Sequence, residues 1–168
     1  NRANLVIDGI NLTAAINGVD LGSNIEYVPH TIYDTGMIEH SRGNVVMNDG
    51  TINASNYGIY SSDAEAAGIT INGGSVTGTK RGISVIASSV IVNGGTITGN
   101  DEYGIYNHKS TTTINDGTVK SNTTTAIFMA YPLYVNGGNV IGKTYGVYTD
   151  QYCDAYAGGC GYPTITVS

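Results

Sequence analysis

The sequence contains no tryptophan, a single phenylalanine and few charged residues. Charged side chains make up 12% of the 168 residues, and only seven residues are Lys or Arg, so the formal net charge is −6. So few basic residues leave no basic stripe that could neutralise a run of phosphates. The composition therefore argues against a nucleic acid partner.

The chain also lacks any apolar run that approaches the length of a bilayer crossing, so we expect no membrane insertion. Its first residues, Asn1 to Asn4, resemble neither a start methionine nor a signal peptide, and we therefore expect the chain to be part of a longer protein. No window shows a sustained helical spacing of apolar residues. With 24 Gly and 13 Tyr, the composition favours strands and turns, and we predict one all-β domain over residues 1–168.

The chain has only two cysteines, Cys153 and Cys160, in the stretch CDAYAGGC. Small and flexible residues separate them, so we expect a local disulfide, which is typical of a protein outside the cytoplasm. The alternative is a pair of free thiols in a reducing compartment. Without a nearby His, this spacing does not resemble a zinc site.

A repeat of about twenty-two residues runs through most of the sequence. The motif Asn-[Gly/Asp]-Gly begins at Asn48, Asn72, Asn93, Asn115 and Asn136, at intervals of 24, 21, 22 and 21 residues. Each unit has an apolar segment before the motif, a short apolar segment after it, and a third segment such as Gly58-Ile59-Tyr60. Three strands and three turns per unit predict one coil of a parallel β-solenoid.

In a stacked coil, equivalent residues of successive rungs form columns about 4.8 Å apart. The Asn column is predicted to stabilise the turns, because Asn tolerates a left-handed backbone and its amide can bond to the Asn of the next rung. Strand alternation predicts which aliphatic side chains face inward. These are Met47, Ile71, Val92, Ile114 and Val135, the residues two positions before each of them, and Ile52 and Ile59 with their equivalents.

The sequence at this point resembles the right-handed parallel β-helix superfamily, the pectate-lyase-like solenoids. The string Val-Asn-Gly-Gly-Thr-Ile-Thr-Gly at 92–99 is similar to repeats of bacterial cell-surface adhesins. The resemblance implies irregular first rungs over 1–43, regular rungs over 44–150, and a C-terminal loop and last strand over 151–168. It also implies an extracellular or cell-surface location.

Enzymes with this fold would need carboxylates and a basic residue together on one exposed sheet. The candidates for catalysis are Glu39, His40 and Arg42, which lie before the regular rungs. We predict no metal site and no cofactor, although calcium is kept open in the loops beside the third strand. Its ligands there would be Asp63, Glu65, Asp101 and Glu102.

Aromatic residues recur in the third strand, at the position after the inward Ile. We expect these rings, Tyr60, Tyr106, Phe128 and Tyr148, to face outward, with Ser84 in the same column. The residues two positions earlier are Gly58, Gly82, Gly104, Ala126 and Gly146, and small side chains there predict a shallow groove. A strip of rings beside a groove suits the face of a sugar. Alternatively, the rings stack on one another and hold no ligand.

These patterns favour a secreted or surface module of a bacterial adhesin that binds a glycan or a host or matrix surface through the four rings. A polysaccharide lyase or glycoside hydrolase is the first alternative. A purely structural spacer is the second.

Overall fold

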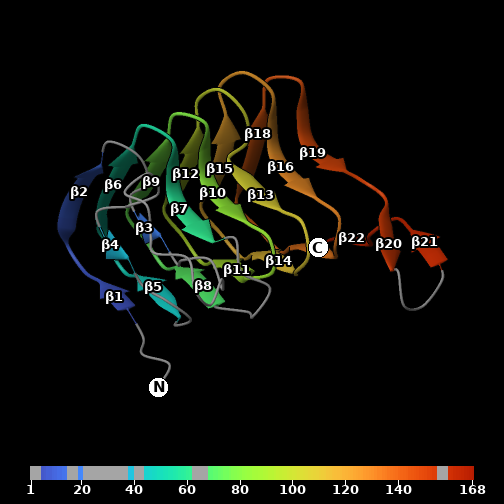
Figure 1. The fold of residues 1–168 in the computed structure, drawn as a ribbon, viewed down its shortest axis with the longest axis horizontal. Helices are drawn as coiled ribbons and strands as arrows, with labels where there is room; N and C mark the ends of the chain where they lie inside the picture. Colours follow the sequence, from blue (N-terminus) through green and yellow to red (C-terminus); the bar gives the residue numbers. More distant parts are fainter. Residues whose placement is uncertain (1–4, 15–18, 21–37, 40–43, 62–67, 155–158) are drawn as a thin grey trace, which may run out of the picture.

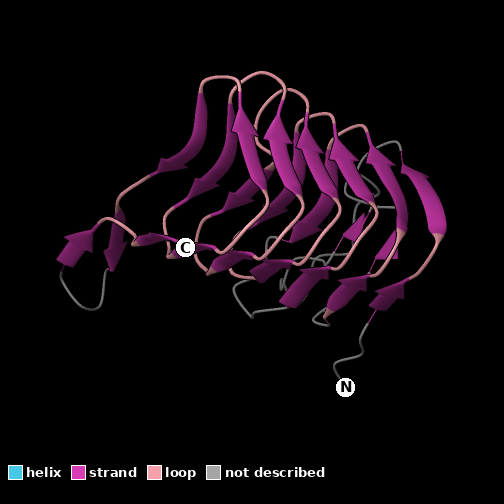
Figure 2. Ribbon diagram, turned by 180° about the vertical axis from the view of Figure 1, so that it is seen from behind, coloured by secondary structure: helices cyan, strands magenta, loops and turns pink. Residues whose placement is uncertain are grey.

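The computed structural model describes residues 5–14, 19–20, 38–39, 44–61, 68–154 and 159–168. Within these ranges the chain forms strands and turns, and the strands stack into three parallel sheets around one core (Figure 1). The prediction of a right-handed parallel β-helix with three strands in each rung is confirmed. Seen from behind, the successive rungs lie side by side along the whole body (Figure 2).

The first sheet carries the strands that precede the Asn motif. Its order is β1 Leu5–Ile7, β5 Val45–Met47, β8 Gly68–Ile71, β11 Ser89–Val92, β14 Thr112–Ile114, β17 Leu133–Val135 and β22 Ile165–Val167. The second sheet carries the strands that follow the motif. Its order is β2 Ile10–Ala14, β6 Gly50–Ala54, β9 Ser75–Gly78, β12 Thr96–Gly99, β15 Thr118–Ser121 and β18 Asn139–Gly142.

The third sheet carries the aromatic strands. From one edge to the other its strands are β19 Tyr145–Thr149, β16 Thr125–Met129, β13 Ile105–Asn107, β10 Arg81–Val85, β7 Tyr57–Ser61, β3 Val19–Asp20 and β4 Ile38–Glu39. The opening strands β1 and β2 pair in register with β5 and β6, so residues 5–14 belong to a further rung, as the sequence predicts.

A ladder of asparagine side chains links the turns between the first and second sheets. Asn72 Nδ2 donates to Asn48 Oδ1 at 2.9 Å, and Asn93 Nδ2 donates to Asn72 Oδ1 at 2.8 Å. The same bond, also at 2.8 Å, joins Asn115 to Asn93 and Asn136 to Asn115. Each interior amide therefore donates to one rung and accepts from the next, which confirms the predicted role of this column.

The last residue of each Asn motif is a glycine with a positive φ. At Gly95, φ is 78° and a Cβ atom would lie 2.6 Å from the carbonyl oxygen of Gly74 in the preceding rung. Any other residue would be strained by the backbone angle and would also clash with the neighbouring turn. The turns can stack this closely because no side chain stands between them.

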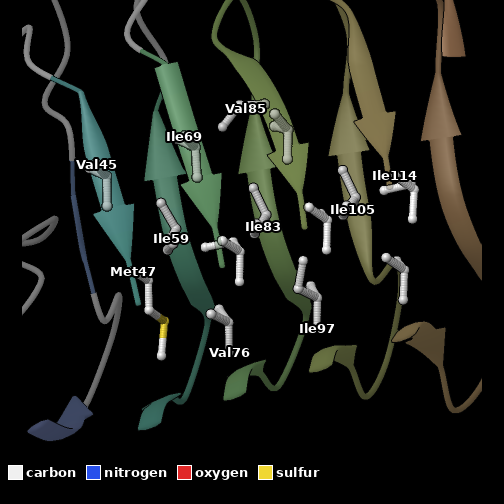
Figure 3. Packing of buried hydrophobic residues seen from close by; sticks show 14 of the residues in the cluster. Val45, Met47, Ile59, Ile69, Val76, Ile83, Val85, Ile97, Ile105 and Ile114 are labelled. Carbon is white, nitrogen blue, oxygen red and sulfur yellow. The ribbon is translucent and has the colours of Figure 1, made fainter. Parts of the chain in front are cut away.

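The core is a continuous column of aliphatic side chains between the three sheets (Figure 3). Ile59, Ile83, Ile105 and Ile127 pair with one another across the third sheet, and all four are fully buried. The predicted inward residues of the first sheet are buried in the same way from Val45 to Leu133, whereas Val135 is partly exposed. A single rung has few apolar residues of its own to pack against, so the burial of these side chains depends on the neighbouring rungs.

A hairpin follows the last strand of the third sheet and extends from that end of the solenoid (Figure 1). Its strands β20 Tyr152–Asp154 and β21 Gly159–Gly161 pair antiparallel, with Cys153 directly opposite Cys160. Opposite residues of such a pair have Cα atoms about 4.5–5.5 Å apart, within the range that a disulfide spans. The register supports the predicted disulfide, which stays a prediction. None of the described residues forms a helix that is long and apolar enough to span a membrane.

Replacing Asn93 by Ala should destabilise the solenoid, because it removes one donated and one accepted hydrogen bond from the middle of the ladder. We expect a loss of about 1–2 kcal/mol in the free energy of unfolding, measured by denaturant titration. The matched control is Asn53→Ala, at an exposed position outside the ladder. Equal unfolding midpoints for the two variants would contradict a stabilising role for the ladder.

The disulfide can be tested by alkylating the unfolded protein. We expect iodoacetamide to add no mass before reduction and two adducts after reduction, because the chain has two cysteines and both would be paired. Labelling without a reductant, followed by mass spectrometry, would show that the thiols are free.

Candidate functional site

The four predicted ligand-binding rings lie in one column of the third sheet. Strand register pairs Tyr60 with Ser84, Ser84 with Tyr106, Tyr106 with Phe128, and Phe128 with Tyr148. Tyr60, Tyr106 and Phe128 are half-buried, whereas Tyr148 is 47% exposed. The column exists as predicted, but its solvent access is concentrated at the end that β19 forms.

The rings of this column stack on one another. Tyr106 and Phe128 have ring centroids 4.9 Å apart with an interplanar angle of 10°, and Phe128 and Tyr148 are 5.8 Å apart at 19°. These are favourable offset-stacked distances, close to the spacing of the rungs themselves. Most ring faces along the column are therefore covered by a neighbouring ring, which leaves little room for a sugar there.

A second set of rings stands beside the first. Tyr57 stacks on Tyr60 at 5.2 Å, Tyr103 packs against Tyr106 at 5.8 Å, and Tyr145 approaches Tyr148 at 6.1 Å. Each of these three tyrosines directly precedes a glycine in the sequence, and its ring packs against the column.

Arg81 fills the gap where the column has Ser84 in place of a ring. Its guanidinium carbon lies 4.2 Å from the ring centroid of Tyr106, 5.4 Å from that of Tyr103 and 5.5 Å from that of Tyr57. Cation–π contacts of this kind contribute about 0.5–1 kcal/mol at exposed sites.

The position of the guanidinium is held from two sides. Arg81 Nε donates to Glu102 Oε2 at 2.6 Å, and Nη1 donates to Ser84 Oγ at 3.1 Å. Sequence reasoning missed this role of Arg81. The sequence does contain a signal for this role. The rung that has Ser84 in the ring column also has Arg81 at the position that pairs with Tyr57.

The predicted groove beside the rings is not formed, so that expectation is wrong. Gly58, Gly82 and Gly104 are buried, and a Cβ on Gly58 would lie 2.5 Å from Cγ1 of the core residue Val76. A Cβ on Gly82 would likewise lie 2.6 Å from Cγ2 of Ile97. Each of these glycines is buried together with the isoleucine that follows it, so two successive residues lie against the core. Simple strand alternation therefore assigns these glycines to the wrong face.

The open part of the aromatic surface is a ring pair formed by Tyr145 and Tyr148. The side chains are 55% and 47% exposed. Both lie on β19, the last strand of the third sheet, so no further rung follows them among the described strands. Pairing with β16 fixes the backbone of both residues, and the ring of Tyr148 stacks on the ring of Phe128. This ring pair has the exposure that a stacking ligand needs.

The pKa of the Tyr103 phenol is shifted by its surroundings in this surface. Burial raises its pKa above the usual 10.0, while the positive charge of Arg81 acts in the opposite direction and Glu102 adds to the rise. The phenol is therefore held in its neutral form, as a ring that packs between Tyr106, Phe128 and the guanidinium requires.

The candidate catalytic side chains cannot be placed together. His40 and Arg42 lie outside the described residues, and only the backbone of Glu39 is described, in β4 at one edge of the third sheet. Their catalytic role stays a prediction. Of the four residues considered for calcium, Asp63 and Glu65 also lie outside the described ranges, Glu102 is paired with Arg81, and Asp101 is exposed.

Taken together, the three parallel sheets, the stacked rungs and the Asn ladder define a right-handed parallel β-helix of the pectate-lyase-like superfamily. Residues 2–154 match the family described as "Periplasmic copper-binding protein (NosD)", and the chain belongs to this family. The family's periplasmic location agrees with the predicted location outside the cytoplasm. No curated protein and no solved structure matches the chain.

Copper, which the family description names, does not fit the described residues. Protein sites for copper use Cys, Met and His ligands. No group of three or more His, Cys, Asp or Glu side chains comes together within the part of the chain that the structure describes. Met47 and Met129 are fully buried in the core, and His108 stacks against Tyr106. Within the described ranges, these side chains therefore do not form the ligand set that a copper ion requires.

The raised pKa of Tyr103 predicts a loss of stability at alkaline pH. An unfolded tyrosine releases its proton near its usual pKa, whereas folded Tyr103 releases it at higher pH. The contribution of this group is thus fully present below pH 10.0 and is lost as the pH rises through the folded pKa. Tyr103→Phe should therefore lose less stability than the wild type between about pH 8 and about pH 11, measured by denaturant midpoints. The control is Tyr134→Phe, which removes an exposed phenol; the same pH dependence in both variants would contradict the assignment.

Proposed function

We propose that this chain is a module of a bacterial adhesin-type envelope protein, which contacts a glycan through the ring pair Tyr145 and Tyr148. The observation that carries the proposal is the change in exposure along the ring column. Rings within the column stack on their neighbours, whereas Tyr145 and Tyr148 at its end are about half exposed. Aromatic faces of this kind suit the apolar face of a sugar ring. The partner is a glycan of a host, matrix or neighbouring cell surface.

Rigid support makes this ring pair suitable for binding. Tyr148 rests on Phe128, which rests on Tyr106, and below Tyr106 lies the guanidinium of Arg81. The strand that carries both tyrosines is paired with β16 over its length. Binding to rings that are already ordered costs less conformational entropy than binding to free side chains.

A purely structural spacer is the second candidate, and the interior of the solenoid favours it. The Asn ladder, the aliphatic core and the ring column continue through the regular rungs, and each contact serves to hold one rung on the next. Such a body would keep neighbouring parts of an envelope protein at a defined separation without any ligand. The lyase or hydrolase alternative depends on Glu39, His40 and Arg42, of which the structure describes only the backbone of Glu39.

The double variant Tyr145→Ala, Tyr148→Ala tests glycan contact. We expect the wild type to be retained by a subset of an array of plant, host and bacterial glycans. The double variant should lose that retention while its unfolding midpoint changes little, because both side chains are about half exposed. Tyr106 is unsuitable for this test, since its ring packs between Arg81 and Phe128 and its removal would disturb the column.

The matched control is Tyr134→Ala, whose ring is 41% exposed on β17 of the first sheet. This variant should bind the same glycans as the wild type. A double variant that binds as well as the control would refute the ring pair. A wild type that binds no glycan at all would refute glycan contact and leave the spacer function.

A further inference from the structure

A cleft lies where the C-terminal hairpin meets the turn between the third and first sheets. It has a volume of about 240 Å³ and opens to solvent. The residues that shape it come from the turn before β17 and from both sides of the hairpin. They are Tyr131, Pro132, Tyr152, Tyr162, Pro163 and Thr164.

Aromatic rings form most of the wall of this cleft. Tyr131 and Tyr152 pack edge to face, with ring centroids 4.4 Å apart and an interplanar angle of 60°. Tyr162 is 74% exposed, although large aromatic side chains of a folded protein usually bury most of their surface. An exposed ring in the same cleft as two rings that pack on each other offers a stacking surface with little reorganisation on binding.

The chemistry of the lining identifies the class of ligand. No Asp, Glu, Lys, Arg or His lines the cleft, so it holds no partner for a charged group. Its polar side-chain groups are the phenols of three tyrosines and the hydroxyl of Thr164, which can both donate and accept hydrogen bonds. Apolar ring faces combined with neutral hydroxyls match a pyranose, which has an apolar face and a hydroxyl rim.

The size of the cleft and the net charge of the chain narrow the class of ligand further. At about 240 Å³ the cleft is smaller than the roughly 300–1,000 Å³ pockets that enclose drug-sized ligands, so it suits one sugar ring of a longer chain. The net charge of −6 disfavours a polyanion such as a polyuronate.

We infer that this cleft is a binding subsite for one uncharged hexose unit of an oligosaccharide. The inference goes beyond the proposed contact of the ring pair, because the cleft is lined by different residues and can bind whether or not that contact exists. The two surfaces are neighbours along the chain, since Tyr152 follows Tyr148 by four residues, a span of roughly 13 Å in an extended strand. One oligosaccharide could therefore contact both.

The test uses the whole chain labelled with ¹³C in the tyrosine rings, and it follows the ring signals during titration. The neutral probes are cellohexaose, maltohexaose and chitohexaose, and the anionic probe is trigalacturonate. We expect the signals of Tyr162 and Tyr152 to shift with at least one neutral probe and not with trigalacturonate, while the signal of Tyr134 stays in place. Absence of any shift with all three neutral probes would overturn the inference, as would a stronger response to trigalacturonate.

Substitutions at Tyr162 then assign the contact. Tyr162→Ala should raise the dissociation constant for the responding probe at least about fivefold, because it removes the stacking ring. Tyr162→Phe keeps the ring and should bind more tightly than the Ala variant, and Tyr134→Ala should bind like the wild type. Unchanged binding by Tyr162→Ala, with a wild-type unfolding midpoint, would also overturn the inference.

The same titration on Tyr145→Ala, Tyr148→Ala separates the two proposals. Retained shifts at Tyr162 in that variant, together with lost array retention, would support both sites. Array retention that depends on Tyr145 and Tyr148 without any shift at Tyr162 would overturn the cleft alone. Shifts at Tyr162 in a protein whose array retention does not need the ring pair would support the cleft and refute the ring pair.

Discussion

Parallel pairing of one rung on the next is the constraint on which the rest of this structure depends. This pairing places equivalent side chains of successive rungs at a fixed spacing. A residue type that recurs at the repeat length therefore forms a column along the body. Asn in that position bonds to Asn, and Ile packs on Ile. The turns require Gly, as at Gly95, because a Cβ there would meet the carbonyl oxygen of the rung before it. Fold stability is therefore distributed along the column and is not concentrated in any single rung.

The same spacing decides what the aromatic residues can do. Rungs repeat at about the distance at which aromatic rings stack, so rings in one column satisfy one another and become part of the scaffold. Where the column lacks a ring, Arg81 supplies a flat cationic group in its place. The two proposed contacts therefore lie at the end of the column and in the cleft by the hairpin, where the regular repeat stops.

Family membership agrees with the predicted location outside the cytoplasm, whereas the described residues do not fit copper. The family is described as periplasmic and copper-binding. The regular rungs offer buried methionines and a stacked histidine, but within the described residues they do not group the ligands that a metal needs. A shared β-helix scaffold thus carries over the architecture and the compartment more readily than it carries over a binding site.

The sequence by itself determined the repeat, the three strands of each rung, the inward aliphatic columns and the Asn ladder, because all of these depend on residue type at a constant interval. Tertiary structure alone decided which aromatic faces stay open, since exposure depends on what packs above and below each ring. It also decided that Gly58, Gly82 and Gly104 face the core, because each is buried together with the isoleucine that follows it, which breaks the alternation. The cleft of Tyr131, Tyr152 and Tyr162 could not be predicted either, because it joins three segments that follow no repeat and meet only when the hairpin packs near the last rung.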